Sequence, residues 1–119
     1  MRPAEVAFAL IWSRWVMPLR GKTISGLNGL TNRVVEVSWD GVVRVSRNEL
    51  VGRIPLEPFD WAVRSILQRG AVTRKAINAK FPHRYSSAVQ LVLEQVPIFE
   101  AVGRPAVIRL RADWKERLA

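Results

Sequence analysis

The side chains best suited to chemistry lie in one short segment. Hydroxyl and amide groups can hydrogen-bond to the edges of nucleic-acid bases, and a neighbouring cation can hold a phosphate. The segment's polar members are His83, Arg84, Tyr85, Ser86, Ser87 and Gln90. We therefore interpret residues 83–90 as a candidate edge for contacting a nucleic acid.

The same residues also have simpler roles. Ser87 and Gln90 have the spacing of a helix capping box, in which two side chains satisfy free backbone amides reciprocally. His83 suits a turn, and Arg84 suits a solvated surface. Nucleic-acid binding is therefore the main expectation, and base-specific reading by this edge is a further hypothesis.

Cations from neighbouring segments extend the candidate edge. Some precede it, one stands at the tip of an expected hairpin, and two alternate with apolar residues along its second strand. These cations are Arg74, Lys75, Lys80, Arg104, Arg109 and Arg111. Each can also be an ordinary surface charge, so their combination carries more weight than any single member.

The overall charge favours a polyanionic partner. The chain has 119 residues and a formal net charge of +9, from 15 Arg and 4 Lys against 10 acidic residues. Such an excess attracts phosphate backbones. Duplex DNA is the favoured partner, and RNA or a protein surface is the alternative; with a protein partner the charge would be incidental. The charge could also reflect a proteome that is rich in arginine.

No arrangement of residues points to catalysis or to a cofactor. The chain lacks cysteine, and His83 is its only histidine, so a structural zinc site lacks its usual ligands. The segment from Gly21 to Thr23 lacks the upstream glycine and strand of a phosphate-binding loop. Pairing and turn chemistry explain Glu36 and Asp40. We expect a non-enzymatic protein with no metal, cofactor or small-molecule substrate.

Helices and strands alternate in a defined order over residues 58–111. Capping and helix-breaking residues set their limits. The expected elements are a helix between Pro58 and Gly70, a helix from Arg74 to Phe81 capped by Thr73, a helix from Ser86 or Ser87 to Pro97, and strands Ile98 to Val102 and Ala106 to Arg111.

This order resembles a winged helix-turn-helix DNA-binding domain. By that resemblance, the helix beginning at Ser86 or Ser87 would be a recognition helix in a major groove, and Arg104 would lie at the wing tip. A hairpin followed by a winged helix also resembles accessory DNA-binding modules of restriction-type nucleases, although no nuclease constellation is present. The fold class expected for the whole chain is α+β, with an N-terminal helix and β-hairpin or meander before the winged helix.

A β-hairpin is predicted over residues 33–47, followed by a short strand within residues 50–56. A three-residue loop from Trp39 to Gly41 gives one clean apolar face. That register places Val35 opposite Val45, Val37 opposite Val43, and Glu36 opposite Arg44 as an exposed charge pair. Residues 1–57 would thus form an N-terminal subdomain, and residues 112–119 a tail.

The most apolar stretch is the predicted helix from Pro3 to Met17. It is too short to span a bilayer and lacks a secretory cleavage site, so we expect a cytoplasmic protein without membrane contact. Its apolar residues cover more than one face, which suggests burial on two sides, one against the rest of the domain and the other against a second copy in a homodimer. The residues expected at such an interface are Phe8, Ile11, Trp12 and Trp15.

Overall fold

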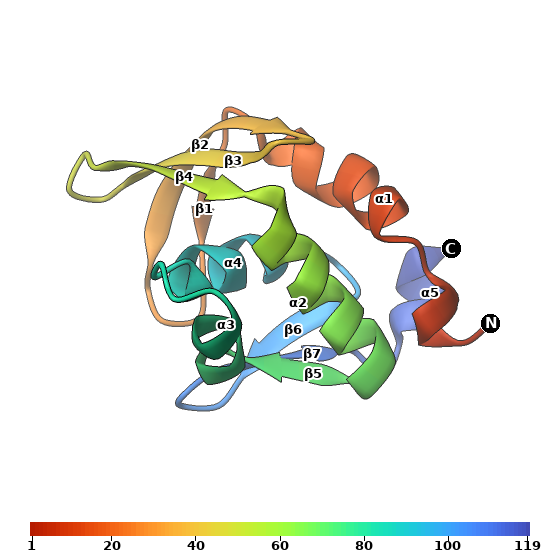
Figure 1. Ribbon diagram of the computed structural model, residues 1–119. Coiled ribbons are helices and arrows are strands. Elements are labelled where there is room, and N and C mark those ends of the chain that lie inside the picture. The colour runs from red at the N-terminus through yellow and green to blue at the C-terminus, as the bar shows by residue number, and fades with distance from the viewer.

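Two antiparallel sheets lie on either side of a layer of helices in the computed structural model, which describes residues 1–119 (Figure 1). The four-stranded sheet has the order β1-β2-β3-β4, and the three-stranded sheet has the order β5-β7-β6. The expected α+β class is confirmed. No helix is long and apolar enough to cross a membrane.

The N-terminal segment is helical but not one continuous α-helix. It consists of a 3₁₀ turn Pro3–Glu5, helix α1 Phe8–Ile11, a π-helical turn Trp12–Val16 and a 3₁₀ turn Met17–Leu19. Ala7 is extended, so the first turn is set apart from α1. The predicted helix was correct in place and wrong in continuity.

The apolar side of this segment faces the protein's own core. Trp12 is fully buried, its ring lies 5.1 Å from that of Phe59 and 5.5 Å from that of Phe8, and its Nε1 donates to the Ser38 carbonyl at 3.1 Å. Ile11 is also fully buried. Placing Phe8, Ile11 and Trp12 at a dimer interface was therefore wrong, because the fold already uses them.

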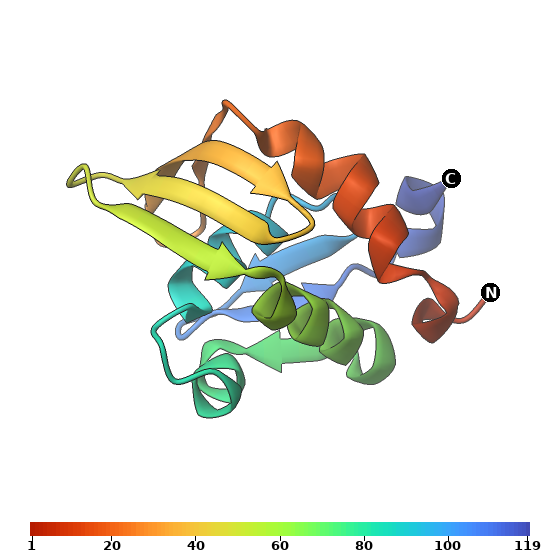
Figure 2. The same cartoon turned by 45° about the horizontal axis from the view of Figure 1, so that its top comes forward.

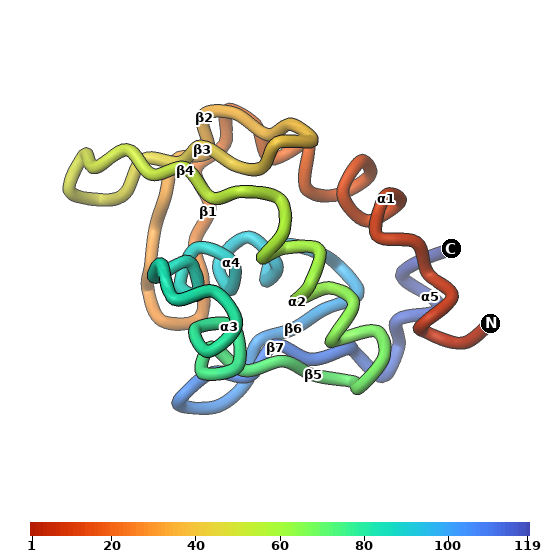
Figure 3. Tube along the Cα trace, in the orientation of Figure 1, coloured from red at the N-terminus to blue at the C-terminus, as the bar shows by residue number.

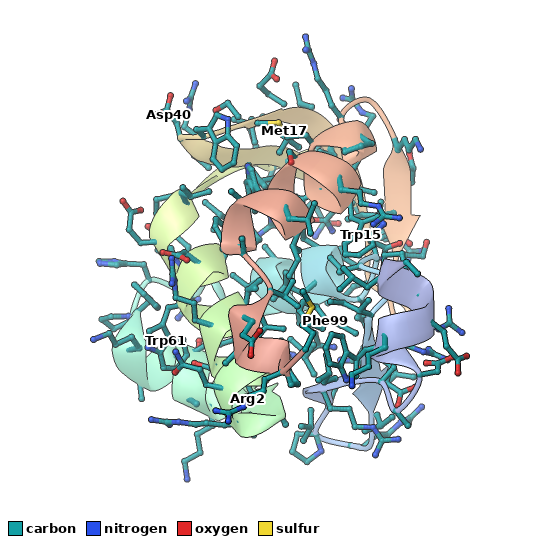
Figure 4. All side chains as sticks on the ribbon, turned by 90° about the vertical axis from the view of Figure 1, so that its right-hand side faces the viewer. Arg2, Trp15, Met17, Asp40, Trp61 and Phe99 are labelled. Atoms are coloured by element: carbon teal, nitrogen blue, oxygen red, sulfur yellow. The ribbon has the colours of Figure 1, made fainter.

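Trp15 lies between the N-terminal segment and the C-terminal helix α5, Trp114–Leu118 (Figure 4). Its ring is half-buried, with the Arg14 guanidinium 4.8 Å from the centroid. Arg14 also donates to the Leu118 carbonyl at 2.6 Å. Residues 112–119 are therefore not a free tail, and Trp114 is buried in the core.

The four-stranded sheet is a meander that covers the helices from one side (Figure 2). Its strands are β1 Thr23–Ser25, β2 Thr31–Ser38, β3 Gly41–Ser46 and β4 Val51–Pro55.

The register of the β2–β3 hairpin differs from the prediction. Val37 pairs with Val42 and Ser38 with Gly41, so the loop has two residues, and the bulge lies at Val35. A Cβ at Gly41 would collide with the Ile54 carbonyl oxygen. Gly41 is thus needed where β4 passes close to β3, a non-local demand that the turn sequence does not reveal.

The expected exposed pair of Glu36 and Arg44 does not form. Glu36 lies 3.3 Å from Arg20, while Arg44 stands on the same face of β3 as the buried Val42. Arg44 Nη1 donates to Asn32 Oδ1 at 2.8 Å, and its buried Nε has no partner. Burial lowers the pKa of the Arg44 guanidinium from its usual value.

Asn32 and Arg44 should be energetically coupled, since each is the other's side-chain partner under the sheet. We expect Asn32→Val and Arg44→Met each to lower the free energy of unfolding, because each leaves a polar group unsatisfied. The double variant should lose less than the sum of the singles, by roughly 1 kcal/mol. Urea unfolding of the four proteins measures this coupling, and strict additivity would contradict it.

The rest of the chain supplies the remaining helices and the second sheet. A left-handed Gly70 ends the first helix, as predicted, with φ 91° and its N–H bonded to the Ile66 carbonyl. Thr73 caps the second helix, also as predicted, by accepting the Ala76 N–H. The elements are α2 Leu56–Arg69, β5 Ala71–Thr73, α3 Arg74–Lys80, α4 Ser86–Leu93, β6 Phe99–Val102 and β7 Val107–Leu110.

One hydrophobic core joins both halves of the chain. It comprises 27 buried residues, which run from Val6 to Trp114 and include the inner face of the four-stranded sheet. The short strand β5, which was not predicted, pairs with β7 and ties α2 to the C-terminal hairpin. The helix layer, and α4 in particular, is therefore covered on both sides.

Candidate nucleic-acid interface

Helix α4, the expected recognition helix, is enclosed in the protein. Seven of its eight residues are buried. It contacts α2 and α3 on the helix layer, β6 in one sheet and β1 in the other. It therefore has no exposed polar face to place in a groove.

The β1–β2 loop closes over α4 from the N-terminal half. Glu94 Oε1 accepts the Leu27 N–H at 3.0 Å, and Gln95 Nε2 donates to the Ser25 carbonyl at 2.9 Å. A Cβ at Gly26 would lie 2.8 Å from Leu91 Cδ1. The loop can approach α4 this closely because residue 26 is glycine.

Two of the expected base-contacting residues are consequently inaccessible. Ser86 is 3% exposed and Gln90 is 2% exposed, and Gln90 Oε1 has no hydrogen-bond partner. The predicted capping box is also wrong, since Tyr85 occupies the N-cap position and no side chain caps α4. Ser87 is half-buried. Their polarity predicted a solvent-facing edge, but α4 packs against α2, α3, β1 and β6, and part of this enclosure comes from the N-terminal half of the chain.

A basic surface remains beside the enclosed helix. We use this name for five Arg and Lys side chains and the imidazole of His83 on α3, the α3–α4 turn and the β6–β7 turn, which are exposed except for the half-buried Arg74. None of them lies within 4.0 Å of a carboxylate. The basic surface consists of Arg74, Lys75, Lys80, His83, Arg84 and Arg104.

The turn between α3 and α4 exposes His83 and Arg84. Arg84 has a left-handed φ of 61°. The rings of His83 and Tyr85 lie 5.6 Å apart, with Tyr85 half-buried against the fold. The left-handed residue and the half-buried Tyr85 thus fix the conformation of the turn, which leaves His83 and Arg84 exposed to solvent.

The local charge is strongly one-sided. Between Asp60 and Glu94 the sequence contains no acidic residue. The same stretch carries six basic residues, of which Arg64 and Arg69 lie on α2 while Arg74, Lys75, Lys80 and Arg84 lie on α3 and the α3–α4 turn. The latter four produce a positive field around α3 and the α3–α4 turn. Figure 3 shows the backbone of these two segments side by side at one end of the fold.

Arg109 and Arg111 do not belong to this surface. Arg109 Nε lies 2.9 Å from Glu100 Oε1, and Arg111 bridges Glu100 and Asp113 at 3.4 and 3.3 Å. Hydrogen bonds from Arg117 and Arg111 hold the pKa of the Asp113 carboxyl below its usual value. The expectation that these two arginines present free guanidiniums was wrong, because β6 brings Glu100 opposite Arg109.

Other concavities differ from the basic surface in their lining; the one lined by Arg33 and Arg47 on the four-stranded sheet also includes Glu49. No cluster of three or more His, Asp or Glu side chains could hold a metal ion. The largest concavity, about 660 Å³, lies along β2, β3 and β4 and is lined in part by Glu36 and Asp40, which repel phosphate. Comparison with protein-family models, curated proteins and solved structures finds no significant match for the chain. Its function can be inferred only from its own residues.

Proposed function

We propose that the protein is a non-catalytic nucleic-acid-binding protein that contacts the phosphate backbone, foremost of duplex DNA, through the basic surface. The observation that carries this proposal is a group of six basic side chains from three segments, none of them paired with a carboxylate. Unpaired cations gathered on one side are the electrostatic footprint of phosphate binding.

We further propose that residues 58–111 form a winged helix that does not use α4 as a recognition helix. Three helices followed by a hairpin support this, as does the pairing of β5 with β7 in the order β5-β7-β6. Because α4 is covered, the contacts come from α3 and the adjoining turns. Such a surface contacts the phosphate backbone of the nucleic acid and therefore has little preference for base sequence.

The test is the salt dependence of binding to two duplexes of unrelated sequence, measured by fluorescence anisotropy. With four or more phosphate contacts, the slope of log K against log salt should be about −4 or steeper. The two duplexes should bind within about threefold of each other, since phosphate contacts carry no sequence information. A shallow slope, or a strong preference for one duplex, would contradict backbone binding.

Competition at fixed salt concentration shows which nucleic acid the protein binds most tightly. Duplex DNA should displace the labelled duplex more effectively than single-stranded DNA or structured RNA of equal length. If structured RNA competes more strongly than duplex DNA, the proposed partner becomes RNA or a ribonucleoprotein, which the same surface could bind.

A protein-interaction role is the second candidate. It is favoured by four exposed large apolar residues on or beside the four-stranded sheet, Val35, Trp39, Leu50 and Val51. Leu50→Ser/Val51→Ser should leave duplex affinity unchanged if the two surfaces are independent, and a loss of affinity would place this part of the sheet in the nucleic-acid interface.

A further inference from the structure

Three segments of the chain converge on a small concavity at the edge of the basic surface. Its volume is about 340 Å³. The β1–β2 loop, the start of α3 and the β6–β7 turn line it with Asn28, Arg74, Arg104, Pro105 and Ala106. The first of these segments comes from the N-terminal half, outside the proposed winged helix.

The polar lining of this concavity suits an anion. Arg74 and Arg104 are both cationic, and neither has a carboxylate within 4.0 Å. Two arginines that line one concavity create a positive potential there, and an anion between them would offset their mutual repulsion. A guanidinium donates in a planar fork that matches phosphate oxygens, and the Asn28 amide adds a neutral donor.

The backbone of the two loops is shaped by neighbouring glycines. Gly29 follows Asn28 with φ 72°, and Gly103 precedes Arg104 with φ 82°. Both values lie in the left-handed region that glycine adopts at little cost. Asn28 and Arg104 therefore stand on turns of defined geometry.

We propose that this concavity is a phosphate seat, in which Asn28, Arg74 and Arg104 together hold one phosphate group. Within the proposed function, on which this assignment rests, the occupant is a phosphodiester of the nucleic-acid backbone. The β1–β2 loop then has two roles: it covers α4, and it supplies part of a backbone contact in place of the base contacts that α4 cannot make.

A single added carboxylate tests the seat without removing any cation. Asn28→Asp places a negative charge in the concavity, and Asn48→Asp places the same charge in the exposed β3–β4 turn. We expect Asn28→Asp to weaken duplex affinity about tenfold, because the carboxylate occupies the guanidiniums. Asn48→Asp should change affinity by less than about twofold, as expected for a screened distant charge.

A second measurement separates the seat from DNA binding. Inorganic phosphate titrated into ¹⁵N-labelled protein should produce saturable shifts at Asn28 and at the Nε of Arg74 and Arg104, and these should vanish in Asn28→Asp. If the wild type binds duplex and the two Asp variants behave alike, the seat is wrong and the proposed function stands. If phosphate shifts the seat while no duplex binds, the proposed function fails and the seat remains. Absence of both effects overturns both.

Discussion

Replacing Lys80, Arg84 and Arg104 with alanine should lower duplex affinity about 100-fold at moderate salt, if each phosphate contact contributes on the order of 1 kcal/mol. The three side chains are exposed and come from α3, the α3–α4 turn and the β6–β7 turn. Their loss should also flatten the slope of log K against log salt by about 2.7, at about 0.9 per contact. Fluorescence anisotropy over a salt series measures both quantities.

The matched control removes the same charge from another side of the molecule. Arg2, Arg69 and Lys115 are exposed and pair with no carboxylate. They lie near the N-terminus, at the end of α2 and in α5, away from α3; Figure 4 shows Arg2 on that side. Their triple alanine variant should lose less than about fivefold in affinity, since only the general field changes. Equal losses in the two triple variants would mean that net charge, and not the basic surface, determines binding.

Trp12→Glu should destabilise the fold by about 4 kcal/mol or more, since it removes a large buried side chain and buries a carboxylate. Trp12 packs between Phe8 and Phe59, and its indole N–H reaches the Ser38 carbonyl. The expected result is loss of the cooperative unfolding transition at room temperature, measured by circular dichroism and urea titration. A folded Trp12→Glu protein would contradict this placement of the indole.

Leu10→Glu provides the control on the same helix. Leu10 is 42% exposed, so the added carboxylate remains solvated and stability should change by less than about 1 kcal/mol. Light scattering of the Leu10 variant also addresses self-association through the exposed side of α1. A mass that falls from dimer to monomer would place a dimer interface there, although not on the residues first expected.

Local sequence signals predicted the elements whose causes are local. The Asp40–Gly41 turn signal, the Gly70 stop and the Thr73 cap identified the hairpin and the limits of two helices correctly. Each of these features is decided by residues within a few positions of one another.

Features that depend on distant segments were missed. The three residues of β5 become a strand only because β7 lies beside them. Gly41 fits a turn equally well in two registers, and the approach of β4 decides between them. The polarity of Ser86 and Gln90 predicted exposure, while α4 is enclosed by α2, α3, β1 and β6 and both residues are buried. Propensity alone does not contain such tertiary effects.

The candidate site was therefore predicted only in part. The basic residues of α3, the α3–α4 turn and the β6–β7 turn are accessible, as a binding role requires. The sequence does not predict a binding role for Asn28, because nothing in it places residues 25–31 beside residues 74 and 104. The only local signal is the position of Asn28 between Gly26 and Gly29 in an expected loop.

The β1–β2 loop, which covers α4, also determines which fragments of the chain can fold on their own. A fragment that begins near residue 56 would keep the three helices and the C-terminal hairpin but would lose the backbone partners of Glu94 and Gln95. It would also open the core that Ile24, Val34 and Val42 share with the helices. Apolar surface uncovered in this way promotes aggregation. Recombinant work on the C-terminal half alone should therefore retain β1 and β2, because the minimal folding unit does not coincide with the boundary suggested by the motif.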